Sequence, residues 1–123
     1  MSKELEFIRE CGYFYVLTMN GDFPAGRPFG AMMEDENYLY IATHDGNEAH
    51  KQLRENSHLQ ILAKKEGIRE WLRITGTVEE CSDDKAVKEK FLEECPVLVS
   101  HYGSAENEHY LVFRIKVLNS EFK

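Results

Sequence analysis

The sequence contains few cysteines, and they are arranged neither as metal ligands nor as disulfide partners. Its three cysteines, Cys11, Cys81 and Cys95, lie far apart and form no CxxC pair. An odd number of widely spaced cysteines argues against a disulfide framework and against a zinc–thiolate site. The pattern is typical of reduced thiols, and we therefore expect a cytoplasmic protein.

Other absences restrict the kind of partner. No run of apolar residues approaches the ~20 that cross a bilayer, and no apolar leader opens the chain. Basic residues are in the minority, with 15 Lys and Arg against 22 Asp and Glu, and the formal net charge is −7. This charge favours neither nucleic acid nor an anionic membrane as a partner. The five histidines show no HxH or HxxxH spacing, so no metal site is predicted.

The residues that are present predict one domain, residues 1–123, rich in β structure. A chain of 123 residues, 42% of them hydrophobic, is long enough for one core and too short for two. β-Branched and aromatic residues predict a strand over 13–19, and a turn at 20–22 leads into an extended segment over 27–33. A third strand, 38–43, follows in meander order.

Helices are predicted at three places. Ser2 is a suitable cap for a short helix that ends near Gly12. A second helix covers 47–56, and Ser82-Asp83-Asp84, a small polar cap followed by acids, opens a third helix that Pro96 stops. Further strands are expected at 58–64, 69–81 and 109–117. An irregular crossing is expected at 97–103, in which His101 belongs to a surface loop or, as the alternative, lines the ligand pocket.

The predicted strands favour a mainly β fold with accessory helices. Six antiparallel strands with short connections in a chain of this size indicate a closed or half-closed barrel, because closure removes exposed strand edges. Two or three helices would flank the barrel and cover its gaps.

Three polar residues on separate elements suggest an anion site. Arg27 lies on one strand, Thr43 ends the next, and Lys51 lies on the helix that follows. Two cations and a hydroxyl can converge on one phosphate group, and free amides near Asn47 would add to them. Taken singly, Arg27 and Lys51 are equally compatible with solvated surface charges, and Thr43 with a strand end.

The order and spacing of these segments resemble the FMN-binding split-barrel superfamily, whose best-known members are the pyridoxamine 5'-phosphate oxidases. The resemblance is carried by YFYVLT at 13–18, GRPFG at 26–30, LYIAT at 39–43, KQLREN at 51–56 and EWLRITG at 70–76. It lies nearest to the short, nitroimidazole-resistance-type members. The resemblance implies a six-stranded antiparallel split barrel that forms a homodimer, with FMN held in grooves between the subunits.

The resemblance also implies which residues hold the cofactor. In the family an arginine, a strand-ending hydroxyl and the start of the next helix grip the phosphate, while the second strand lies against the flavin ring. The implied phosphate contacts here are Arg27, Thr43, Asn47 and Lys51, and the residues around the ring are Pro28, Phe29, Gly30, Trp71 and Arg73.

The implied activity is an FMN-dependent oxidoreductase that moves two electrons to or from a small molecule. A flavin accepts hydride at its own ring, so the protein needs no nucleophile, and no catalytic residue is assigned. No GxGxxG motif follows a strand, so a reduced nicotinamide, the candidate electron donor, would bind transiently over the flavin.

One departure from the family keeps other functions open. Fuller members carry Ser-Arg-Lys at the start of the helix, where this chain has Asn47, Glu48 and Ala49. The alternatives are a non-catalytic module that binds or senses flavin, haem or deazaflavin, and a barrel that serves only as a dimer scaffold.

Overall fold

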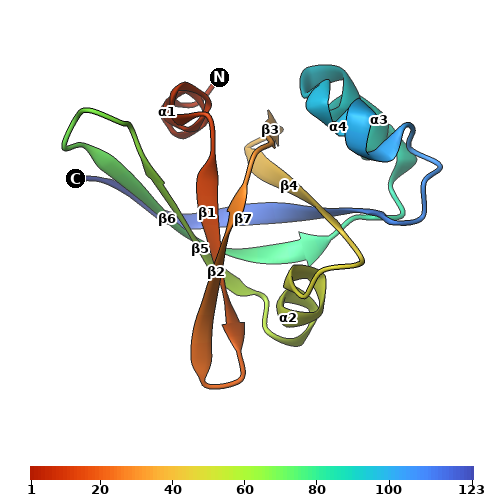
Figure 1. The fold of residues 1–123 in the computed structure, drawn as a ribbon, viewed down its shortest axis with the longest axis horizontal. Coiled ribbons are helices and arrows are strands. Elements are labelled where there is room, and N and C mark those ends of the chain that lie inside the picture. Colours follow the sequence, from red (N-terminus) through yellow and green to blue (C-terminus); the bar gives the residue numbers. More distant parts are fainter.

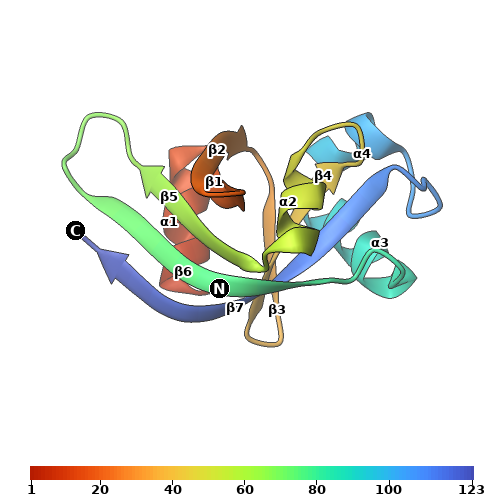
Figure 2. The same cartoon turned by 90° about the horizontal axis from the view of Figure 1, so that it is seen from below.

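The computed structural model describes residues 1–123 as one antiparallel sheet of seven strands with four helices. The sheet coils strongly, as Figures 1 and 2 show. None of the helices has the length and apolar character that crossing a membrane requires. The strands are β1 (Phe14–Asn20), β2 (Phe23–Phe29), β3 (Met32–Asp35), β4 (Tyr38–His44), β5 (His58–Lys64), β6 (Trp71–Glu80) and β7 (Tyr110–Phe122); the helices are α1 (Lys3–Cys11), α2 (Ala49–Glu55), α3 (Lys85–Glu94) and α4 (Val97–Tyr102).

The strand order, β2-β1-β5-β6-β7-β4-β3, corrects the predicted six strands and the meander. The segment 27–33 is two strands, β2 and β3, which lie at opposite ends of the strand order and are joined through Gly30 and Ala31. β2 pairs with β1, whereas β3 pairs with β4. Residues on both sides of the break favour extended structure, so the local pattern carries no sign of the change of partner. The mainly β class is confirmed.

The predicted irregular crossing is also wrong, because residues 97–102 form α4. Pro96 both ends α3 and stands at the N-cap of α4. Proline lacks the backbone N–H that donates a hydrogen bond inside a helix. At the start of a helix the N–H groups have no partner within the helix, so proline is tolerated there. Gly103, with φ of +80°, then ends α4.

Local end signals predicted the other helices. The Ser2 hydroxyl accepts the amide of Leu5 at 3.2 Å, and an Asp84 oxygen accepts that of Val87 at 3.2 Å. Each side chain satisfies an amide that the first helical turn leaves unpaired. The second helix, α2, is shorter than predicted, and β7 runs on to Phe122, five residues beyond the predicted end at 117.

Both faces of β4 and β7 are buried. Ile41 and Phe113 belong to the larger core cluster beneath α1, whereas their neighbours Tyr40 and Val112 belong to a smaller cluster beneath α3 and α4. Strands buried on both faces lose the polar alternation of a half-exposed strand. The end of β4 therefore emerges between two cores, beside α4.

Candidate functional site

A pocket of about 450 Å³ opens where the crossover from β2 to β3 meets the end of β4 and α4. This crossover pocket falls within the ~300–1,000 Å³ usual for small-molecule sites. It brings together five predicted residues, Pro28, Phe29, Gly30, Thr43 and Asn47, and its other lining residues are Ala31, Ala42, His44, Val97, Leu98, His101 and Tyr102. His101 lies on α4 rather than in a surface loop, and it lines this pocket, as the alternative interpretation of residues 101–103 allowed.

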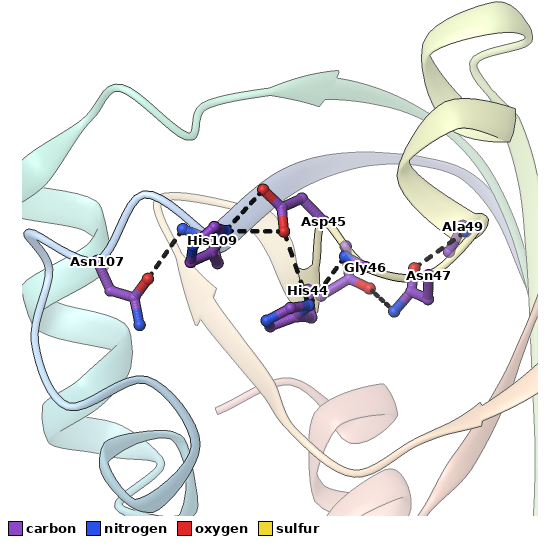
Figure 3. Close-up of polar contacts among 8 residues, drawn as sticks. His44, Asp45, Gly46, Asn47, Ala49, Asn107 and His109 are labelled. Carbon is purple, nitrogen blue, oxygen red and sulfur yellow. Dashed lines mark hydrogen bonds and ion pairs between the residues drawn. The ribbon is translucent and has the colours of Figure 1, made fainter.

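Thr43 and Asn47 form one hydrogen-bonded unit. Thr43 is buried, and its hydroxyl accepts the Asn47 amide at 2.7 Å. The Asn47 side-chain oxygen in turn accepts the backbone amide of Ala49 at 3.1 Å (Figure 3). Asn47 therefore ties the end of β4 to the start of α2 and fixes the intervening loop.

Arg27 lies on β2 beside the pocket residues and makes only neutral contacts. Its guanidinium donates to the Thr18 hydroxyl at 2.8 Å and to the Gln52 side-chain oxygen at 2.6 Å. It also donates to the Val16 carbonyl at 3.3 Å. Partial burial lowers the pKa of Arg27, but an arginine stays charged. The side chain is thus a partly desolvated cation without a carboxylate partner.

The predicted anion site is only partly assembled within one chain. Lys51 is exposed and pairs with Glu48 at 3.6 Å. Its neighbour Gln52, rather than Lys51, reaches Arg27. Arg27, Thr43 and Lys51 make no hydrogen bond to one another, and of the three only Thr43 lines the crossover pocket.

Trp71 and Arg73 do not line the crossover pocket. Arg73 pairs with Leu62 on β5, which pairs with Tyr15 on β1. Tyr15 pairs in turn with Pro28 at the pocket, so three inter-strand steps of ~4.8 Å separate Arg73 from that edge of the pocket. The Arg73 guanidinium lies 5.0 Å from the centre of the Trp71 ring, and Trp71 shares an apolar groove of about 580 Å³ with Tyr13 and Tyr15.

A stack of aromatic rings beside the pocket was not predicted. The His44 ring lies 6.2 Å from Tyr102 and 5.6 Å from His109, and Tyr102 stacks on Tyr110 at 4.7 Å. The register of β4 on β7, in which His44 pairs with Tyr110, brings these rings together. No local spacing could have revealed a stack that joins residues so far apart in the chain.

Asp45 holds the outer histidine of this stack. Both of its carboxylate oxygens lie 3.0 Å from His109 Nδ1 (Figure 3). This contact raises the pKa of His109 and lowers that of Asp45. The pair is therefore strongest with His109 protonated and Asp45 ionised.

The orientation of His44 depends on Gly46. The Gly46 amide donates to His44 Nδ1 at 2.8 Å. A side chain at position 46 would meet Nδ1 at 2.9 Å, so only glycine leaves the ring in place. Because Nδ1 accepts a hydrogen bond, the neutral ring carries its proton on Nε2. His44 can thus act as a hydrogen-bond donor at the pocket.

The sequence matches the family model described as pyridoxamine 5'-phosphate oxidase over residues 2–122. The chain belongs to this family. A solved relative from Clostridium acetobutylicum, a NimC/NimA family protein, is 34% identical, with 98% of this chain and 89% of that chain covered and a TM-score of 0.84. No curated protein matches the sequence.

More distant solved structures of similar fold are named for different ligands. An FAD-binding protein from Mesorhizobium loti is 14% identical, covering 99% of this chain and 94% of that one, with a TM-score of 0.72. The haem storage protein HutZ from Vibrio cholerae is 12% identical, covering 97% and 91%, with a TM-score of 0.77. At these identities the likeness shows the shared fold alone.

Proposed function

We propose that the protein is an FMN-binding oxidoreductase that transfers two electrons to or from a small molecule. Family membership over nearly the whole chain supports flavin binding. The observation that carries the proposal is Arg27, a partly desolvated cation with three neutral acceptors and no carboxylate. In a chain of net charge −7, such an arginine is suited to a phosphate group.

The residues present fit the cofactor. Arg27, with Thr43 and Asn47 at the end of β4, would hold the phosphate, and Pro28, Phe29 and Gly30 would lie along the ring. FMN, when bound, supplies the two-electron chemistry. The protein's own residues position the cofactor. Thr18 and Gln52 orient Arg27, and Asn47 fixes the loop between β4 and α2. His44 Nε2 offers a hydrogen bond, and Tyr102 provides a flat wall that limits water.

We also propose that the working site lies between two copies of the chain. Trp71 and Arg73 do not line the crossover pocket of their own chain, and a second copy could bring them to it. The groove of Tyr13, Tyr15 and Trp71 leaves aromatic surface exposed, with Tyr13 at 52% and Tyr15 at 44%. A homodimer would cover such a patch.

An FMN titration followed by flavin fluorescence tests the proposal. We expect saturable quenching at one FMN per chain, and Arg27→Ala to weaken binding ~10–100-fold through loss of a charge-assisted contact. The matched control is Arg114→Ala on β7, which removes an arginine that pairs with Glu79 of β6. This variant should bind FMN as wild type does. Absence of binding at high micromolar FMN, or equal affinities of both variants, would contradict the assignment.

A non-catalytic binding module is the second candidate. Its support is Lys51, which pairs with Glu48, so the phosphate region has fewer free cations than in the fuller members. Absorption spectra distinguish the outcomes: a haem band or a deazaflavin spectrum would replace the flavin spectrum. Bleaching of bound FMN by a reduced nicotinamide without oxygen, followed by return of the colour when oxygen is admitted as the oxidant, would show that the flavin turns over. The substrate, the nicotinamide donor and the cytoplasmic location stay predictions.

A further inference from the structure

A second hollow adjoins the crossover pocket on the side of α1. This side hollow, of about 240 Å³, is lined by the last turn of α1, the start of β3 and the turn between α3 and α4. Gly30, Ala31 and Val97 line both hollows. A Cβ at Gly30 would meet no atom within 4 Å beyond its chain neighbours, so the space at this junction is open. One elongated molecule could therefore reach from the crossover pocket into the side hollow.

Neither the side hollow nor the crossover pocket is lined by an acidic residue. This is unusual for the chain, since 22 of its 123 residues are Asp or Glu. Glu94, which lies near Cys95, is exposed and lines neither hollow. A bound cation would find no carboxylate in these walls, whereas a bound anion would meet no like charge.

Arg9 is the one charged residue that lines the side hollow. Its guanidinium donates to the Met32 carbonyl at 3.3 Å and forms no ion pair, because the neighbouring Glu10 pairs with Lys65 at 2.6 Å. The Cys95 thiol donates to the same carbonyl at 3.4 Å. Burial raises the pKa of this thiol, and the charge of Arg9 offsets part of the rise. Most of the N–H donors of Arg9 are therefore free to exchange water for an anionic ligand.

The rest of the side hollow is apolar apart from the Cys95 thiol. Ile8, Phe14 and Met32 are buried residues of the larger core cluster, and Pro96 completes the wall. A single cation matches one negative charge, whereas a phosphate of nearly two charges is better held by several donors. The side hollow thus suits a carboxylate that carries a hydrocarbon body.

We propose that the substrate of the flavin site is a monocarboxylate with an apolar body. Its carboxylate pairs with Arg9, and its body lies in the side hollow and extends past Gly30 into the crossover pocket. This inference rests on the proposed function, because it names the molecule that would meet the flavin ring along Pro28, Phe29 and Gly30. Arg9 would bind the charged end of the substrate and take no part in electron transfer.

Three probes that share one flat apolar body and differ in charge test the proposal: cinnamate, cinnamamide and cinnamylamine. In calorimetric titrations of the FMN-loaded protein, cinnamate should bind about tenfold more tightly than the neutral amide, because it gains a charge-assisted contact. The cationic amine should bind most weakly. Equal affinities of cinnamate and cinnamamide, or tighter binding of the amine, would overturn the proposal.

The flavin itself separates this inference from the proposed function. If FMN does not bind, both fail; if FMN binds and cinnamate is not preferred, only this inference fails. Bound cinnamate should also perturb the visible absorption band of FMN, because its body would lie beside the ring. Saturable heat without any change in that band would place cinnamate away from the flavin and overturn the assignment.

A pair of variants on α1 separates a specific contact from general electrostatics. Arg9→Met and Lys3→Met each remove one exposed cation, but only Arg9 lines the side hollow. Arg9→Met should abolish the preference for cinnamate over cinnamamide and leave FMN affinity as in wild type. Lys3→Met should keep the preference. An equal loss in both variants would show that only the total charge matters, and the proposal would fail.

Two neighbouring methionines locate the ligand in the wild-type protein. Met32 lines the side hollow, whereas Met33 lines neither hollow and belongs to the smaller core cluster. The NMR methyl signal of Met32, identified by its absence in Met32→Leu, should shift with cinnamate and saturate at the calorimetric affinity. The Met33 signal should move less. A Met32 signal that stays in place while heat is released would overturn the proposed location.

Discussion

At the scale of single residues, the basic side chains near the candidate site differ in whether an acidic side chain pairs with them. Lys51 forms an exposed ion pair with Glu48, whereas Arg27 has only neutral acceptors. Both are basic residues near the same loop, and no sequence pattern distinguishes the lysine that has an acidic partner from the arginine that has none. The distinction matters because a cation without a counterion gains most from a bound anion.

The His109–Asp45 pair should make stability depend on pH. Asp45 raises the pKa of His109, so this stabilisation is fully present below the unfolded value of about 6.5 and disappears as pH rises through the folded value. His109 lowers the pKa of Asp45, so the stability contributed by ionised Asp45 is lost as pH falls below about 3.9 and through its folded pKa. Thermal unfolding of His109→Asn should therefore vary less with pH above about 6.5 than wild type.

The control for this prediction is His101→Asn, which removes an exposed histidine of α4 without an ion-pair partner. It should keep the wild-type pH profile. A His109→Asn profile that matches that of wild type would show that the pair contributes nothing measurable.

His50 should be a source of instability. It is 5% exposed, and its buried Nδ1 has no hydrogen-bond partner. His50→Leu should raise the free energy of unfolding by about 1 kcal/mol, because an unpaired buried polar atom is removed. In contrast, Gln52→Leu on the same helix should lower it by about 1–3 kcal/mol, because Thr18 and Arg27 lose their acceptor. Urea unfolding measures both, and a destabilised His50→Leu would show that the ring has a role.

At the scale of elements, the long β6–β7 ladder depends on one glycine. The register shifts between Thr75 and Gly76. A Cβ at position 76 would lie 2.5 Å from the Lys116 carbonyl oxygen and 3.1 Å from Ile115 Cγ2. Because the obstacle is backbone, Gly76→Ala should lower the free energy of unfolding by about 3 kcal/mol.

Gly26→Ala on β2 is the matched change, since its Cβ would meet Leu17 at an ordinary 3.5 Å. Denaturant unfolding should show it close to wild type. Similar losses in both variants would mean that the cost comes from the loss of glycine itself rather than from the bulge.

At the scale of the whole molecule, the proposed two-copy site predicts a homodimer. Sedimentation should give twice the 14.3 kDa chain mass. Tyr15→Glu should dissociate the dimer, because it places a charge in the aromatic groove. Phe23→Glu changes a side chain that is 76% exposed at a hairpin tip and should remain dimeric. A wild-type monomer at tens of micromolar would refute the two-copy site.

The sequence by itself determined the local structure. Ser2 and the segment 82–84 predicted helix starts, the turn at 20–22 predicted the β1–β2 hairpin, and the family pattern brought Pro28, Thr43 and Asn47 to one region. These signals act over a few residues, where backbone geometry and nearby hydrogen bonds decide the conformation.

Only the tertiary structure decided which distant segments meet. It separated β2 from β3 at Gly30, placed His44 beside His109, and packed Lys88 against the Tyr110 ring. Strand partners and side-chain neighbours depend on how the whole sheet coils and buries both of its cores, and that balance of long-range packing has no signature in a short stretch of sequence.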